Sequence, residues 1–176
     1  MTITVRHLTR AEVAQVWRID RSEIIHHIYV MTAGQLVHKP AYFAVKGWPP
    51  GEIEQSTQQL LDCYDRGGWC YGAFDEDQLV GVAILESKFI GPAHDQLQLK
   101  FLHVSNGYRQ HGLGRQLFEL ARTEARTRGA RQMYVSATPS ENTVHFYQRR
   151  GCVVAAQPDP ELFALEPEDI HFVCSV

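Results

Sequence analysis

The order of hydrophobic and polar positions along the chain predicts strands and helices in alternation. Strands, with apolar residues at every second position or in short buried runs, are expected at 3–8, 69–74, 79–89, 96–104, 132–137, 153–157 and 170–174. Helices, with apolar residues three and four positions apart, are expected from about 10, at 51–64, from 113 to about 128, and at 140–150. Residues 21–50 give no clear pattern. We therefore expect a mixed α/β domain whose last two strands are antiparallel neighbours.

The strand expected at 96–104 contains a shift in its alternation. Leu97 and Leu99 occupy odd positions, whereas Leu102 and Val104 occupy even positions. A shift of one residue in an apolar strand moves its side chains to the other face and is typical of a β-bulge. We therefore predict a bulge between Leu99 and Leu102.

The segment after this strand has the layout of an anion-binding turn. Residues 109–114 have the sequence Arg-Gln-His-Gly-Leu-Gly, and a strongly amphipathic helix follows. The first N–H groups of a helix have no internal partner, and the helix dipole is positive at the same end. Glycines there let the backbone approach a phosphate closely. The segment is therefore predicted to bind a cofactor that carries a pyrophosphate.

Two common phosphate-binding motifs fit this segment poorly. A Walker loop requires Gly-x4-Gly-Lys-Ser/Thr, and the chain contains no such string. A dinucleotide fingerprint requires a third glycine where this chain has Leu117, and an acidic residue about 20 positions later at the end of a second strand. These mismatches argue against a P-loop protein and against an oxidoreductase that uses a dinucleotide.

The third motif, Arg/Gln-x-x-Gly-x-Gly/Ala, belongs to the GNAT superfamily of N-acetyltransferases, and residues 109–114 resemble it without a mismatch. The predicted bulge and the segment that contains Asn142, Phe146-Tyr147 and Gly151 follow the family's order, so the resemblance covers about residues 96–152. It implies an α/β (α+β) acyl-CoA N-acyltransferase fold. This fold has a mixed, mostly antiparallel sheet of six to seven strands, a bulged central strand and about four helices on both faces. We expect it to form a single domain over residues 1–176.

The resemblance implies that acetyl-CoA is the cosubstrate and that no metal is used. The pyrophosphate would bind at the glycine loop, and the pantetheine arm would bind backbone groups freed by the bulge. Many members carry Asn seven residues before the Tyr, where this chain has Ser140, so Asn142 departs from the family pattern. The implied cofactor-binding residues are Leu102, Val104, Arg109, Gln110, His111, Gly112, Leu113, Gly114, Arg115 and Asn142.

The same resemblance implies that Tyr147 is the general acid. A phenol with a pKa of about 10 can protonate the thiolate that leaves the thioester. Histone-type members carry a Glu on the bulged strand where this chain has Gln98, and an amide cannot accept the proton of the amine. Glu86, on the preceding strand, and His103, beside the bulge, stay open as general bases.

The amino-acid composition limits the kinds of partner that the chain is expected to bind. A chain of 176 residues with 44% hydrophobic and 21% charged residues is typical of a soluble globular domain. Its net charge of −3 gives no basic surface for nucleic acid or for a membrane, and no apolar stretch approaches the roughly 18 residues of a bilayer span. The N-terminus lacks the apolar region of a signal peptide, so a cytoplasmic protein is expected. The four cysteines contain no Cys-x-x-Cys pair and are expected to be buried and reduced.

Together these features predict an N-acetyltransferase that moves an acetyl group directly to a primary amine in a ternary complex. A small-molecule amine is favoured because residues 21–50 are rich in groups suited to cation–π contacts: His26, His27, Tyr29, Tyr42 and Trp48. The adjacent pair His26-His27 makes a poor metal site because neighbouring side chains point apart. The alternative function is a module that senses acyl-CoA without turning it over. Relatives are often homodimers through their late strands.

Overall fold

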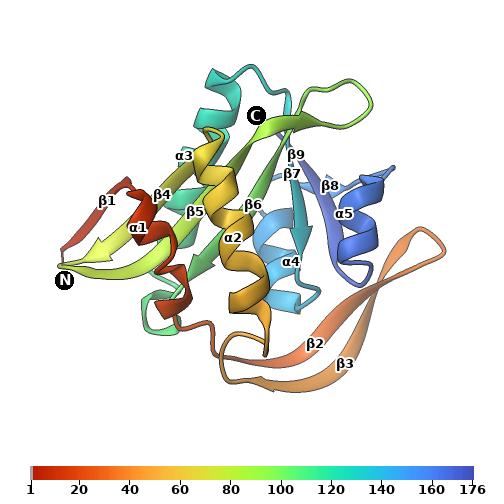
Figure 1. The fold of residues 1–176 in the computed structure, drawn as a ribbon. Helices are drawn as coiled ribbons and strands as arrows, with labels where there is room; N and C mark the ends of the chain where they lie inside the picture. The colour runs from red at the N-terminus through yellow and green to blue at the C-terminus, as the bar shows by residue number, and fades with distance from the viewer. Residues whose placement is uncertain (1) are drawn as a thin grey trace.

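The computed structural model describes residues 2–176, which are built around a seven-stranded sheet (Figure 1). The strands lie in the order β1 (Ile3–His7), β4 (Trp69–Asp75), β5 (Gln78–Ile90), β6 (Gln96–Val104), β7 (Gln132–Ala137), β9 (Ile170–Ser175) and β8 (Val153–Val154). Only β6 and β7 are parallel; every other neighbouring pair is antiparallel. Parallel strands need a crossover, which α3 (Leu113–Thr127) supplies. The predicted mixed, mostly antiparallel sheet is confirmed.

Helices cover both faces of this sheet, as predicted. On one face α1 (Arg10–Val13), the 3₁₀ helix η1 (Val16–Arg18) and α2 (Glu52–Asp65) pack in a core with Phe74, Ile84 and Phe101. On the other face α3 and α4 (Glu141–Gln148) pack in a core with Leu85, Leu97 and Leu99. No helix within residues 2–176 is long and apolar enough to cross a membrane.

A fifth helix, α5 (Pro160–Leu165), was not predicted from the sequence. Its signal is nevertheless present, because Asp159 caps the helix by accepting hydrogen bonds from the N–H groups of Glu161 and Leu162. Pro160 follows at the first helical position, where the missing N–H costs nothing. The helix was missed because it is short and has no fully buried residue to give it an apolar stripe.

Most of residues 21–50 form a long antiparallel hairpin that is separate from the main sheet. Its strands are β2 (Glu23–Thr32) and β3 (Gln35–Val45). Ala33 and Gly34 both have positive φ angles, 49° and 78°, as the tight turn between twisted strands requires. Most residues on both strands are at least partly exposed, so no regular alternation marks them. Figure 1 shows the hairpin extending away from the sheet and passing α4.

The bulge in β6 falls at Lys100, as predicted. Phe101 lies opposite Ile84 and Leu99 lies opposite Leu85, so Lys100 has no partner on β5. On its other edge, β6 pairs with β7 only over Gln96–Gln98. Beyond that point the two strands separate, while β7 stays paired with β9 as far as Ala137. The backbone of residues 99–104 therefore has an edge that β7 does not cover.

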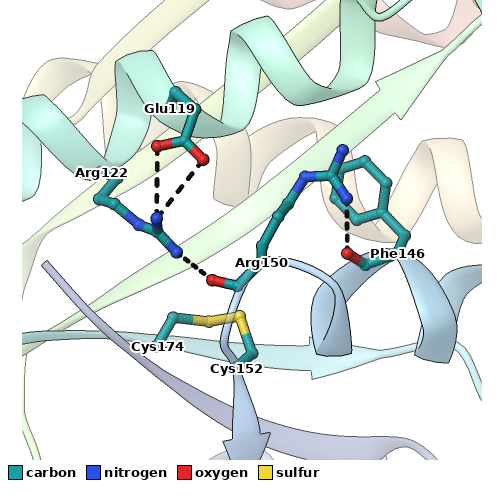
Figure 2. Close-up of a disulfide and its surroundings, with 6 residues drawn as sticks. All are labelled: Glu119, Arg122, Phe146, Arg150, Cys152 and Cys174. Carbon is teal, nitrogen blue, oxygen red and sulfur yellow. Dashed lines mark hydrogen bonds and ion pairs between the residues drawn. A yellow bond between two sulfur atoms is a disulfide. The ribbon is translucent and has the colours of Figure 1, made fainter.

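The cysteines are buried, as expected, but they are not all reduced. Cys152 and Cys174 form a disulfide with an S–S distance of 2.05 Å, whereas Cys63 and Cys70 are free (Figure 2). The expectation of four reduced cysteines was wrong for this pair. Spacing along the chain could not show it, because the two residues become neighbours only when β8 pairs with β9 and Val153 lies opposite Val173.

Reduction of this disulfide should destabilise the protein. The bond closes a loop between residues 22 positions apart, and loops of that size typically contribute about 2–4 kcal/mol to the free energy of unfolding. Urea unfolding with and without dithiothreitol measures the difference. Cys63→Ser should keep the response to reductant and Cys152→Ser should lose it. Identical curves for the wild type in both conditions would show that the bond does not form.

Candidate active site

The loop between β6 and α3 is shaped to receive an anion. Gln110 and Gly112 both adopt left-handed backbone conformations, with φ of 67° and 81°. Such residues turn consecutive N–H groups toward one point and form a concave anion site. The first helical hydrogen bond of α3 runs from Gln116 N to Gly112 O, which leaves three earlier N–H groups without a helix partner. No acidic residue occupies the first turn of α3. The backbone of this loop, which we call the cradle, therefore has the geometry of the predicted anion site, and phosphate binding there stays a prediction.

Gly114 lets α4 approach this cradle closely. A Cβ at Gly114 would lie 3.3 Å from the ring of Phe146, so a larger side chain would displace that ring. The guanidinium of Arg150 lies 3.5 Å above the same ring and donates a hydrogen bond to Phe146 O (Figure 2). Burial lowers the pKa of Arg150, and the charges of Arg115 and Arg122 lower it as well. Arg115 and Arg150 therefore place positive charge near the start of α3, whereas Arg122 is paired with Glu119 at 3.3 Å.

The side chain of Arg109 does not face the cradle. Its guanidinium donates to the carbonyl of Val104 at 2.9 Å, to that of Ser22 at 3.0 Å and to that of Asp20 at 3.4 Å. Arg109 therefore ties the chain before β2 to the end of β6. Any contact of this residue with a phosphate is left to its backbone.

The other residues expected at the cofactor lie near the cradle or on the separated part of β6. His111 and Arg115 are exposed, and Leu113 is buried beneath the loop as the first residue of α3. Leu102 and Val104 are partly buried on the face of the sheet that α3 covers.

Asn142 is the exception among the expected cofactor contacts. Its side-chain amide donates to Glu23 Oε1 at 3.0 Å, so it contacts the start of the hairpin. Ser140, at the position where many members carry Asn, caps α4 by accepting from Thr143 N at 3.4 Å. Both residues fix the beginning of α4.

Tyr147 is buried among aromatic rings of α3, α4 and β9. The centroids of Phe118, Phe146 and Phe172 lie 5.1–6.0 Å from its ring. Burial raises the pKa of Tyr147 above its ordinary value, so the phenol stays protonated at neutral pH. Within residues 2–176, no side chain or backbone group forms a hydrogen bond with its hydroxyl. Tyr147 therefore carries the proton that the predicted role of general acid needs, and burial at the same time makes the phenol a weaker acid.

Glu86 is held in a buried ion pair. Its carboxylate accepts hydrogen bonds from Arg66, at the end of α2, and lies 3.7 Å from Nζ of Lys100, the bulge residue. Burial acts to raise the pKa of Glu86, but the hydrogen bond from Arg66 and the charge of Lys100 outweigh it, and the pKa is lowered. The carboxylate is therefore ionised and engaged, which makes it a weak proton acceptor.

His103 lies among aromatic rings on the α2 side of the sheet. Its ring centroid is 4.9 Å from that of Trp48 and 4.5 Å from that of Phe101. Burial lowers the pKa of His103 to about 3, and the charges of Arg21 and Arg109 contribute. The imidazole is therefore neutral at physiological pH, but it binds a proton weakly.

Asp169, immediately before β9, was not predicted as a site residue. Burial raises its pKa to about 7, and the negative charges of Glu166 and Glu168 add to the rise. Asp169 also lies near enough to Tyr147 for its charge to raise the pKa of that phenol. In the sequence, residues 166–169 resemble an ordinary acidic turn, and only the fold shows that Asp169 is partly buried.

Comparison with known proteins agrees with this geometry. The sequence matches the model of the acetyltransferase (GNAT) family over residues 35–152, about two thirds of the chain. A search of curated protein sequences found no significant match.

Solved structures share the fold at low sequence identity. Nourseothricin acetyltransferase has 20% identity and a TM-score of 0.74, and 99% of each chain is covered. PaiA N-acetyltransferase from Thermoplasma acidophilum, solved with coenzyme A, has 16% identity and a TM-score of 0.66, with 100% of each chain covered. The ribosomal-protein-S18-alanine N-acetyltransferase from Escherichia coli has 15% identity and a TM-score of 0.62, over 99% of this chain and 94% of that one.

The cradle, the bulged strand and the separated strands thus occur in a chain whose sequence matches a family of acetyltransferases over most of its length. The protein belongs to the GNAT family of acetyltransferases.

Proposed function

We propose that this protein transfers an acetyl group from acetyl-CoA directly to a primary amine of a small molecule, within a ternary complex. The observation that carries the proposal is the separation of β6 from β7 after Gln98, directly upstream of an anion cradle. It leaves backbone groups of residues 99–104 available to an extended ligand whose phosphates bind at Gly112. Acetyl-CoA has this shape, with a pyrophosphate at one end and a thioester at the other.

Different parts of the chain would contribute to different steps of the reaction. Backbone N–H groups from Gly112 to Arg115 would hold the pyrophosphate. Backbone groups of the bulged strand would orient the thioester and polarise its carbonyl. The amine nitrogen forms a bond to the acetyl carbon as the carbon–sulfur bond breaks. Tyr147 gives its proton to the departing thiolate, and a base takes the proton that the amine loses.

The hairpin supports a small acceptor. In this family the corresponding segment borders the acceptor, and here it is fastened to the start of α4: Tyr29 N donates to Pro139 O at 2.8 Å, and Asn142 donates to Glu23. A fastened hairpin forms a fixed wall rather than an open groove for a peptide. Beside it, Arg21 lies 5.0 Å above the ring of Trp48, which shows that this ring accepts a cation.

Among the structural relatives, one is named for nourseothricin and another for an alanine of ribosomal protein S18, so the fold itself does not choose the acceptor. Release of free thiol from acetyl-CoA, measured against parallel panels of small amines and peptides, tests the proposal. Turnover of small amines supports it. Turnover confined to peptides would overturn the choice of acceptor but not the family assignment.

Asp169 is our choice for the base, ahead of Glu86 and His103. The Glu86 carboxylate is engaged by Arg66 and Lys100, and His103 binds a proton weakly. Asp169 lies near enough to Tyr147 for its charge to raise the pKa of that phenol, and its own pKa is about 7, so its carboxylate is available near neutral pH.

Replacing Tyr147 with Phe should lower kcat by about 10²- to 10⁴-fold, because the thiolate would leave without a proton. The Kd for acetyl-CoA should stay unchanged, since the hydroxyl makes no contact with the cradle. Steady-state kinetics and calorimetry measure the two quantities. Tyr71→Phe, a partly buried tyrosine on β4, is the matched control. An unchanged kcat in Tyr147→Phe would remove Tyr147 from the mechanism.

Gly112→Ala should weaken acetyl-CoA binding by about tenfold. Gly112 has a φ of 81° and an added Cβ would meet nothing within 4 Å, so the substitution acts through the backbone alone. A left-handed non-glycine residue costs about 1–3 kcal/mol, which the cradle can avoid only by changing shape. Gly129→Ala, at the other end of α3 with a φ of 91°, imposes the same strain away from the cradle. Equal Kd values for both variants would argue against the cradle.

Asp169→Asn should stabilise the protein more at pH 8 than at pH 5. Because the carboxyl pKa rises from 3.8 to about 7 on folding, the wild type loses stability as the pH rises through this range. Asparagine carries no charge and so removes that loss. Thermal unfolding of the wild type and the variant at the two pH values measures the difference. Glu168→Gln, at an exposed position, is the control. If Asp169 is the base, its protonation should lower the kcat of the wild type below about pH 7. The variant should not show this pH dependence. A stability difference that is independent of pH would contradict the environment described for Asp169.

A further inference from the structure

The hairpin and the first turn of α4 bring three metal-ligating side chains together. Tyr29 lies opposite His38 in the hairpin, and His27, two residues before Tyr29, is the diagonal neighbour of His38 on the same face. Glu141, the first residue of α4, meets both histidines. Its carboxylate lies 2.9 Å from Nε2 of His38 and 3.6 Å from Nδ1 of His27. One nitrogen or oxygen from each of the three residues lies within 4.8 Å of the other two.

We propose that His27, His38 and Glu141 bind a divalent transition-metal ion, with Zn²⁺ as the representative, and that this ion fastens the hairpin to α4. Imidazole nitrogens and a carboxylate are ordinary zinc ligands. Ligand atoms about 2.0–2.1 Å from a tetrahedral zinc ion lie about 3.3–3.4 Å from one another. The distance from His38 Nε2 to Glu141 Oε1 is 2.9 Å and that from His27 Nδ1 to Glu141 Oε2 is 3.6 Å, so the two fall on either side of that value.

Only a small rearrangement is needed to complete the site. The two imidazoles are stacked, with centroids 4.7 Å apart and an angle of 17° between their planes, so their lone pairs do not yet meet at one point. Rotation of one ring would direct the lone pairs of His27 Nδ1 and His38 Nε2 toward one point beside the carboxylate. The side chains of His27 and His38 are 41% and 42% exposed, which gives each ring space to turn and gives an ion access from solvent.

Neighbouring residues pack against the proposed ligands and fix the position of the hairpin face. The Tyr29 ring lies 5.1 Å from the His38 ring at an angle of 53°, and the Tyr29 hydroxyl shares a hydrogen bond of 2.9 Å with Nε2 of His145. This contact holds the hairpin face against the middle of α4.

The proposed site differs from the expectation of no metal, which rested on four cysteines without a Cys-x-x-Cys pair and on the adjacent pair His26-His27. Those two side chains do diverge, since His26 packs against Tyr42 at 5.8 Å while His27 stacks on His38. The second histidine comes from the opposite strand and the carboxylate from α4, 103 residues beyond His38. A ligand set drawn from three segments of the chain would cross-link them. A two-stranded hairpin alone is only marginally stable, so such a link has a physical use.

Calorimetric titration of the untagged full-length protein with Zn²⁺ tests the proposal, after treatment with a chelator. We expect one ion per chain, and a melting temperature that rises with added Zn²⁺, because the ion binds the folded form. His38→Ala and Glu141→Gln should each weaken binding by at least about tenfold. Co²⁺ in place of Zn²⁺ should give visible absorption that these variants lose.

His26→Ala is the matched control, since it removes the adjacent histidine from the same strand and should leave binding unchanged. Circular dichroism without metal establishes that each variant is folded. The proposal is overturned if the folded wild type binds no Zn²⁺, if His38→Ala binds as tightly as the wild type, or if His26→Ala weakens binding as much as His38→Ala. None of these readouts uses acetyl transfer, so the result is independent of the proposed activity.

Discussion

The site depends on the limited pairing between β6 and β7. Because these strands are parallel and joined through α3, full pairing between them would bury every backbone group along the interface. Pairing instead stops at Gln98, two residues before the bulge at Lys100, and the strands separate toward the end of β6 that leads into the cradle. The open backbone edge is therefore produced by one local change in strand pairing, directly before the loop that leads into α3.

Ion pairs of Glu86 stabilise the irregular pairing between β5 and β6. Lys100 has no partner on β5, and the β5 segment 86–88 likewise lacks one-to-one partners on β6. The ammonium of Lys100 lies beside Glu86, and Arg66 from the end of α2 engages the same carboxylate. A buried carboxylate is costly to leave unpaired in a low-dielectric region, and the two cationic partners of Glu86 prevent this. In this structure Glu86 therefore stabilises the bulge that we propose to bind acetyl-CoA.

The sequence predicted those parts of the site that rest on local periodicity. The bulge could be read from the change in parity between Leu99 and Leu102, and the cradle from glycines placed between a strand and an amphipathic helix. Features created by distant contacts left no such signal. The Cys152–Cys174 bond depends on the pairing of β8 with β9, and the environment of Asp169 depends on burial before β9. The orientation of Arg109 toward Ser22 depends on where the chain passes before the hairpin.

The hairpin explains why sequence patterns were weakest where specificity is expected. A strand in the main sheet has a clear apolar pattern because one or both of its faces are buried in the core, whereas β2 and β3 are partly exposed on both faces and are free to carry polar and aromatic residues. Their contacts with the protein run through the first turns of α4, by way of Tyr29, His38 and Glu23. Tyr147 lies on the same short helix, shortly after His145 and Glu141. The position of Tyr147, which we propose as the general acid, and the position of the proposed acceptor wall are thus set by the same helix, so a change that shifts the hairpin is expected to act on Tyr147 as well.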